Sequence, residues 1–414
     1  MKDRWGNPLS YGDRQAAADY GDAVWMMHGY HPDTLAKIDQ VLADHPDFAM
    51  AHCFRAAALA SAMDKAFEDD ARQSLSAAEA LEDRSNPRER AYMRAARAWI
   101  EGDFEGATEG FGRIAIAWPR DMLAVQLAHA GDFFLGYSHM LRDRVARVLP
   151  AWSPNEEGYG FLMGMYAFGL EESGDYAKAE AFGCEAVRLN PADGWAVHAV
   201  THVMEMQGRS QDGVRWLTKT EGGWTQAAAF AYHNWWHKAL FHLDRGETAA
   251  VFEIFDAHLA TAVGQAVELV DATAMLWRLT VLGHDVGNRW APVAKAWAER
   301  VEHGFYAFND VHAMMAFASM AADSDQDRQM RTLHRAAANA STNGMMSLQV
   351  GLPAARGFAA FARRDYAAAI EQLLPLRGIA NRFGGSHAQR DVLLFTLSEA
   401  AIRSGDKALA SALS

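Results

Sequence analysis

Two segments of the sequence carry histidines at the spacing of one helical turn. The segment WAVHAVTHVMEMQG contains His198, His202 and Glu205, and the later segment AYHNWWHKALFHLDRG contains His233 and His237. Residues three or four apart lie on one face of an α-helix, so each segment predicts a helix with imidazoles along one side. Imidazole transfers protons near neutral pH and is the commonest metal-binding side chain. These residue types therefore point to acid–base or metal chemistry.

The two histidine pairs share one register. His198 precedes His233 by 35 residues, and His202 precedes His237 by the same 35 residues. A repeat of that length places both pairs at equivalent positions of neighbouring helices, whose axes lie about 8–10 Å apart when they pack. Glu205 falls within about 60° of the first pair around the helix axis. We therefore expect the four imidazoles to converge, with the Glu205 carboxylate beside them.

Three interpretations of these histidines stay open. In the first, they are hydrogen-bonded residues that shape a groove. In the second, His202 and His237 transfer protons as acid–base catalysts and Glu205 fixes a histidine tautomer, while the other two histidines orient or bind the ligand. In the third, a divalent metal ion is bound by the imidazoles, because histidines one turn apart can chelate an ion; its ligands would be His198, His202, His233 and His237. The order of His and Glu differs from the H-E-x-x-H motif of zinc peptidases, which gives no support here.

Other polar residues are expected to reach the same groove and to contact a ligand there. They are Asn234, His129, Asn309, Asp310, His312 and Arg390. Arg390 could supply a cationic contact to an anionic ligand. Taken singly, His129 and His312 are better explained as buried histidines with satisfied hydrogen bonds.

The elements that position these residues are predicted to be helices. Ala-rich segments with helical periodicity run along the chain, and alternating β-branched segments are lacking. Gly102, Gly174 and Gly246 each begin a segment of tetratricopeptide type, and successive ones are 72 residues apart. That interval equals two units of about 36 residues, close to the tetratricopeptide length of about 34.

The sequence therefore predicts an all-α fold, a TPR-like α-solenoid of helical hairpins curled around a concave pocket. We expect one array over residues 1–414, with a candidate break between halves near residues 321–330. The first helix of each hairpin is expected to line the concave face. Residues 195–207 and 232–244 are predicted to form two such helices.

The composition argues against several classes of protein. The chain has 39 basic and 52 acidic residues and a formal net charge of −13, which disfavours a general surface for nucleic acid or anionic membranes. It contains no uninterrupted apolar run long enough to span a membrane, and its first residues lack the apolar core of a secretory signal. Cys53 and Cys184 form neither a disulfide framework nor a thiolate metal site. A cytoplasmic location is predicted, with neither nucleic acid nor membrane as a partner.

Long segments of the chain resemble the tetratricopeptide repeat protein 38 family. The segments are DFFLGYSHMLRDRVARVLPAWSP, DGWAVHAVTHVMEMQGRSQDGVRWL, YHNWWHKALFHLDRGE, NDVHAMMA and GGSHAQRDV, and the resemblance covers nearly the whole chain. The residues that match the family pattern are His198, His202, Glu205, His233, Asn234, His237, His129, Asn309, Asp310, His312, Arg390 and Asp391. The resemblance implies a helical-repeat fold and a soluble protein, without a defined reaction.

Taken together, the residues and the resemblance predict a TPR-like protein that binds a small polar molecule in a histidine-rich concave site. Acid–base or metal-assisted chemistry would make it an enzyme, and a divalent metal is the candidate cofactor. The alternative is a non-catalytic scaffold that holds a peptide or protein partner in the same groove, as many repeat arrays do.

Overall fold

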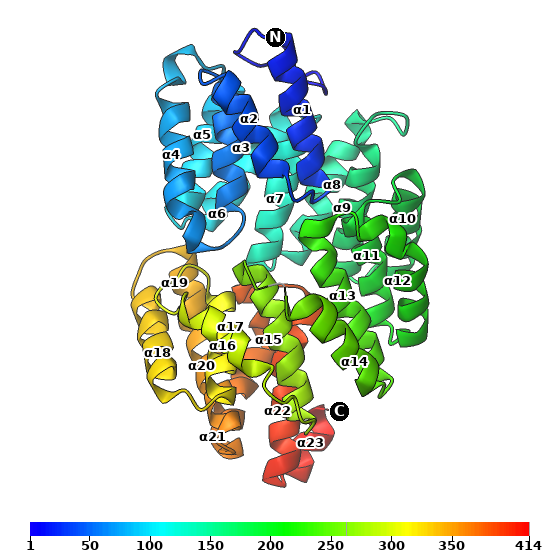
Figure 1. Ribbon diagram of the computed structural model, residues 1–414, viewed down its shortest axis with the longest axis vertical. Coiled ribbons are helices and arrows are strands. Elements are labelled where there is room, and N and C mark those ends of the chain that lie inside the picture. Colours follow the sequence, from blue (N-terminus) through cyan, green and yellow to red (C-terminus); the bar gives the residue numbers. More distant parts are fainter. Residues whose placement is uncertain (262, 414) are drawn as a thin grey trace. The chain divides into compact units, whose positions relative to one another are not determined.

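Helices occupy most of the chain in the computed structural model, which describes residues 1–261 and 263–413 (Figure 1). Within these residues no β-sheet forms, and a single isolated antiparallel bridge joins Lys2 and Pro8. The all-α fold predicted from the periodicity of the sequence is therefore confirmed.

The chain divides into two units. The first comprises Met1–Phe133 and Tyr137–Asn234. Its helices are α1 (Arg14–His28), α2 (Thr34–Asp44), α3 (Ala49–Ala60), α4 (Glu68–Glu79), α5 (Pro87–Ile100), α6 (Phe104–Ala117), α7 (Met122–Leu135), α8 (Ser138–Val148), α9 (Tyr159–Glu172), α10 (Tyr176–Leu189), α11 (Gly194–Met206) and α12 (Ser210–Trp224).

The second unit comprises Phe134–Gly136 and the residues from Trp235 onward. Its helices are α14 (Thr248–Ile254), α15 (Ala266–Val281), α16 (Trp290–Ala298), α17 (Ala307–Ser319), α18 (Asp323–Ala337), α19 (Thr342–Met346), α20 (Leu352–Ala362), α21 (Tyr366–Leu373), α22 (His387–Ser404) and α23 (Lys407–Leu413). Helix α13 (Ala228–Asp244) contributes residues to both units.

Shorter 3-10 and π-helical segments occur in both units. They are η1 (Lys65–Phe67), η2 (Glu82–Arg84), η3 (Leu149–Ala151), η4 (Phe255–Leu259), η5 (Ser347–Gly351), η6 (Leu374–Gly378) and η7 (Ala380–Phe383).

A residue in the left-handed backbone region closes the turn of several helical hairpins. Gly102, Gly174 and Gly246 have φ angles of 85°, 81° and 72°, as expected for the glycines that mark the repeat. Glycine adopts this conformation without the steric cost that a Cβ atom brings. Ala321 and Arg364 hold the same region, at 49° and 62°, in the turns before α18 and α21.

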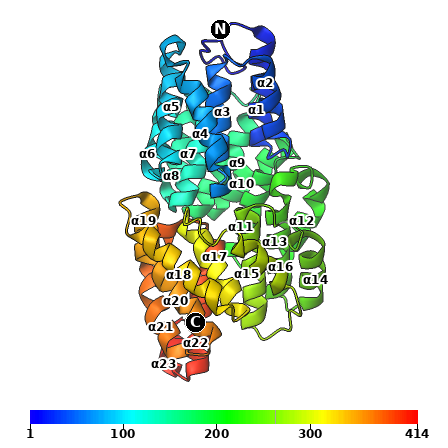
Figure 2. The same cartoon turned by 60° about the vertical axis from the view of Figure 1, so that its left-hand side comes forward.

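Small residues set the spacing between α10 and its neighbours α9 and α11. The residues that α10 buries are Ala179, Gly183 and Ala186. A Cβ atom on Gly183 would lie 2.5 Å from Val200 Cγ2, so the glycine lets α10 approach α11 closely. Figure 2 shows α9, α10, α11 and α12 following one another through the first unit. Helix α11, which carries two of the four histidines, is thereby held on its α10 side by close packing.

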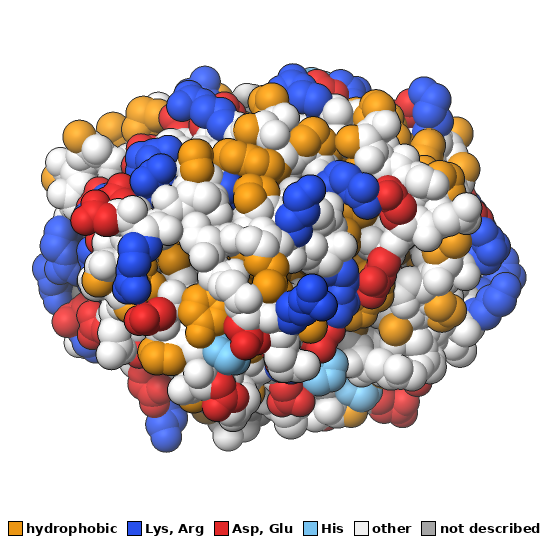
Figure 3. All heavy atoms as spheres, turned by 90° about the horizontal axis from the view of Figure 1, so that it is seen from above, with side chains coloured by type: hydrophobic (Ala, Val, Ile, Leu, Met, Phe, Trp, Pro, Cys, Tyr) orange, Lys and Arg blue, Asp and Glu red, His pale blue; other side chains and the backbone are white. Residues whose placement is uncertain are grey.

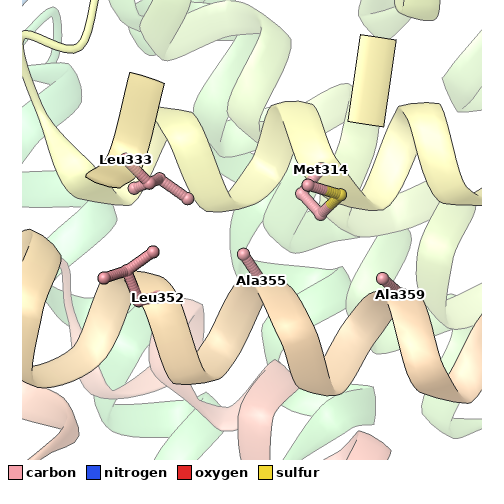
Figure 4. Packing of buried hydrophobic residues seen from close by; sticks show 5 residues of the cluster. All are labelled: Met314, Leu333, Leu352, Ala355 and Ala359. Carbon is pink, nitrogen blue, oxygen red and sulfur yellow. The ribbon is translucent and has the colours of Figure 1, made fainter. Parts of the chain in front are cut away.

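The second unit has an apolar core of the same type. Met314 of α17 and Leu333 of α18 pack with Leu352, Ala355 and Ala359 of α20. Figure 4 shows the three α20 residues along one side of their helix, facing the other two. The small side chains of Ala355 and Ala359 let α20 approach its neighbours closely.

Residues 321–330, the candidate break, lie inside the second unit. They contain the hairpin turn at Ala321 and the first turns of α18, which begins at Asp323. The boundary between the two units falls between Asn234 and Trp235 within α13.

Candidate metal centre

Helix α11 is fixed at its N-terminus, just before its first histidine. The Asp193 side chain accepts a hydrogen bond from the Ala196 backbone N–H at 2.9 Å and caps the helix. Asn234 Nδ2 of α13 donates to the Gly194 carbonyl oxygen at 3.2 Å and ties the two helices together. Asn234, expected to contact a ligand, therefore also positions the histidines, and its ligand role stays a prediction.

The structure brings together the four histidines that share the 35-residue register. We call His198, His202, His233 and His237 the histidine group; one ring nitrogen from each lies within 4.8 Å of the others. The Nε2 atoms of His198 and His233 are 3.1 Å apart and form a hydrogen bond. The four residues are between 0% and 6% exposed. The group is therefore a buried cluster that could hold a metal ion.

Helix α13 supplies half of the histidine group. It begins at Ala228, four residues before the predicted start, and runs unbroken to Asp244. The boundary between the units crosses it, so His233 belongs to the first unit and His237 to the second. Because the helix is continuous, His237 follows His233 by one turn on the same face.

Aromatic rings surround the imidazoles. Phe168 stacks on His198 with ring centroids 5.2 Å apart and meets His202 edge-on at the same distance. Trp195 and Phe230 lie 5.0 and 5.2 Å from His198. These apolar walls lower the local polarity, which strengthens electrostatic interactions at the group.

A carboxylate that the sequence analysis missed lies against the group. Glu171 Oε2 of α9 is 3.4 Å from His202 Nδ1, and both side chains are fully buried. A signal for it existed in the repeat, because Glu171 stands three residues before Gly174, just as Glu205 stands three residues before Gly208. Glu205 itself is half-buried near the end of α11. Its proposed role in fixing a histidine tautomer stays a prediction.

Glu172 makes a second candidate ligand set with the same histidine. Ligand atoms of Glu171, Glu172 and His202 all lie within 4.8 Å of one another, and all three residues are buried. We call Glu171 and Glu172 the carboxylate pair. Ser138 donates a hydrogen bond to Glu172 Oε2 at 3.3 Å and so steadies this side chain. His202 therefore takes part in both sets.

His129 lies beside the aromatic wall. Its ring is 5.7 Å from that of Trp195 and 6.0 Å from that of Phe168. Burial lowers the pKa of His129 to about 3, and it does the same to His28 of α1. Both rings are therefore uncharged at neutral pH. His28 was not singled out from the sequence, because it stands alone there without a repeat partner.

The remaining predicted ligand residues lie in the second unit. Asn309, Asp310 and His312 are buried in the first half of α17. His312 shares a hydrogen bond of 2.8 Å with the Phe308 carbonyl oxygen, and burial lowers its pKa to about 4. Burial raises the pKa of Asp310 to about 7, and its Oδ1 accepts a hydrogen bond from Gln329 at 3.0 Å. These contacts give His312 and Asp310 roles in the packing of α17.

Arg390 is buried near the start of α22. Its Nη1 donates to the backbone carbonyl oxygen of Gly385, in the turn that precedes the helix. The guanidinium therefore braces this turn. Contact with an anionic ligand stays a prediction.

No protein-family model matches the sequence. Within the described residues, no helix combines the length and the apolar character that spanning a bilayer requires. On the face drawn in Figure 3, lysine and arginine side chains are interspersed with aspartate and glutamate, and no single sign dominates it. The chain is thus an all-α helical protein whose most distinctive chemical feature is the buried histidine group.

Proposed function

We propose that the protein binds a divalent metal ion at the histidine group and uses it to bind a small polar molecule. The observation that carries this proposal is the mutual separation of the four imidazole nitrogens, all within 4.8 Å. Two ligands of one tetrahedral zinc ion, each about 2.0–2.2 Å from it, lie roughly 3.3–3.6 Å apart. The His198–His233 distance of 3.1 Å is close to this value. Small side-chain movements would suffice to place an ion among the rings.

A catalytic ion needs an open coordination position, whereas a structural ion has none. We assign the ion to His198, His202 and His233, which belong to one unit and leave that position open. His237 then stays available as a general acid or base next to the ion. An ion held by uncharged imidazoles keeps its positive charge, polarises a bound oxygen and lowers the pKa of bound water.

The resemblance to the tetratricopeptide repeat protein 38 family supports the same proposal. The residues that match the family pattern include the whole histidine group. Histidine, acidic and amide side chains are the kinds that active sites use. We therefore propose that the chain belongs to that family. We also propose that it is an enzyme and not a passive scaffold.

A ligand screen on the metal-free and the zinc-loaded protein tests the function. We expect a small polar or anionic metabolite to raise the melting temperature of the zinc-loaded form and to have little effect on the metal-free form. A metabolite that raises the melting temperature of both forms equally would show that its binding does not require the ion. Capture of a peptide by the protein, with no metabolite effect, would favour the scaffold alternative.

A further inference from the structure

We infer that the centre holds a second divalent ion, bound by His202, Glu171 and Glu172 next to the ion of the histidine group. This inference deepens the proposed function and rests on it. Its basis is that His202 belongs to two sets of candidate ligands. One is the histidine group and the other is His202 with the carboxylate pair, and within each set the ligand atoms lie within 4.8 Å of one another. The six residues involved are all buried.

The distance between His202 and Glu171 is that of two ligands on one ion. His202 Nδ1 lies 3.4 Å from Glu171 Oε2. A hydrogen bond between an imidazolium and a carboxylate is shorter, about 2.7–2.9 Å. Two nitrogen or oxygen ligands of one tetrahedral ion lie roughly 3.3–3.6 Å apart. The pair therefore fits a shared cation better than a direct charged contact.

The shape of the imidazole ring separates the two ions. Nδ1 and Nε2 point out of different edges of the ring, so one ion cannot be bound by both. Nδ1 of His202 faces Glu171, which leaves Nε2 for the ion of the histidine group. His202 thus bridges two neighbouring cations, and Glu172 completes the protein ligands of the second one.

Charge favours this arrangement in a buried place. Ligand atoms of the carboxylate pair lie within 4.8 Å of one another, and a cation between the two ionised groups would remove their mutual repulsion. Binding an ion at each ring nitrogen of His202 releases the ring N–H proton to solvent and leaves the ring with one negative charge. Two divalent ions then carry four positive charges, while the two carboxylates and this ring carry three negative charges. One positive charge is left, which suits an anionic oxygen ligand. We therefore assign the small molecule to the carboxylates or phosphates that two-metal centres bind through oxygen.

Counting zinc ions per chain tests the inference. Metal-free protein is loaded with zinc, freed of excess by gel filtration and measured by elemental analysis together with protein concentration. We expect two ions per chain. One ion per chain would overturn the second site and leave the proposed function standing. A chain that retains no zinc would overturn both.

A pair of isosteric variants locates the second ion. Glu172→Gln removes one charge from the carboxylate pair at constant size, and we expect it to reduce the zinc content from two ions to one. The control is Glu185→Gln, which neutralises an exposed glutamate of α10 paired with Arg188; it should keep two. Zinc content that stays at two in Glu172→Gln would place the extra ion elsewhere and overturn the inference. Should Glu172→Gln fail to fold, the wild-type count and two separate zinc peaks in anomalous diffraction decide instead.

Discussion

A hydrogen shared between two imidazoles occupies the position that a metal ion would take. His198 Nε2 and His233 Nε2 are 3.1 Å apart, so one of them donates to the other. An ion requires a free electron pair on both nitrogens, and the shared hydrogen must then leave this position. The ligand atoms are thus already in place, and binding requires a change of hydrogen position and small side-chain movements.

Replacing one histidine of the group should weaken metal binding strongly. We expect His233→Gln to lower zinc affinity by about 10²-fold or more. Mutation of a residue that only hydrogen-bonds to a metal ligand already lowers metal affinity by about 10–100-fold. Isothermal titration of the metal-free protein with zinc measures this. The matched control is His242→Gln on the same helix, where His242 Nδ1 is paired with Glu247 at 2.7 Å. Equal affinities for the two variants would contradict the assignment of the group.

Asp310 should make the protein less stable as the pH rises. Its pKa is raised from 3.8 to about 7 by burial, so folding favours the protonated form. The stabilising contribution is complete below the unfolded value and is lost as the pH rises through the folded value.

The variant Asp310→Asn stays neutral and keeps an oxygen that can accept the Gln329 hydrogen bond. Between pH 4.5 and 7 the unfolding free energy of the wild type should fall with rising pH. The slope should be steeper than that of the variant by up to about 1.4 kcal/mol per pH unit. Urea unfolding at a series of pH values measures the difference. Identical slopes would show that Asp310 is not held protonated.

Spacing alone predicted the histidine group, because the same repeat step separates both pairs. Glu171 was missed because it lies on α9, one repeat earlier, where no histidine marks the helix. Asn234 was predicted as a ligand residue, but the sequence could not reveal its hydrogen bond to the Gly194 carbonyl oxygen. Such contacts depend on how two helices pack, which single-helix periodicity does not specify.

At the scale of elements, the left-handed turn residues set the hairpins. The turn glycines were visible in the sequence because they recur at a fixed interval, and α11 begins and ends within one residue of its predicted bounds. The left-handed backbone at Ala321 and Arg364 is not readable from the sequence, because neither residue is typical of this region. Residues 321–330 are predicted as a break between halves, and this stays a prediction.

Exchanging glycine and alanine at two turns should change stability in opposite directions. Ala321→Gly relieves a left-handed alanine and should raise the unfolding free energy by about 0.5–1 kcal/mol, less the added entropy of the unfolded glycine. Gly174→Ala introduces the same strain at a φ of 81°, where a Cβ atom would meet no neighbour. It should lower the unfolding free energy by about 1 kcal/mol. Chemical denaturation compares the two; changes of the same sign would contradict this account of the turns.

At the scale of the whole molecule, three residues of the histidine group, His198, His202 and His233, belong to the first unit. α13 contributes His233 to the first unit and His237 to the second. A ligand that binds the folded state alone adds RT ln(1 + [L]/Kd) to the free energy of unfolding. Metal binding is therefore expected to stabilise the folded state.

Removing the metal should make the protein easier to unfold. With free zinc at 1,000 times its dissociation constant, binding adds about 4 kcal/mol to the unfolding free energy. We expect a chelator to lower the melting temperature and added zinc to restore it. A variant with His198 and His233 both replaced by Gln should show smaller effects, because only the ion bound by His202, Glu171 and Glu172 is left. A chelator effect of equal size in that variant would assign the stabilisation to another site.

X-ray absorption spectroscopy at the zinc edge tests the metal centre most directly. The spectrum is recorded on zinc-loaded Glu172→Gln, which should hold only the ion of the histidine group. We predict imidazole scattering from at least three histidines, with nitrogen atoms about 2.0–2.1 Å from the ion, and loss of that pattern when His198→Gln is added. A zinc spectrum with oxygen ligands alone, unchanged by His198→Gln, would contradict the account.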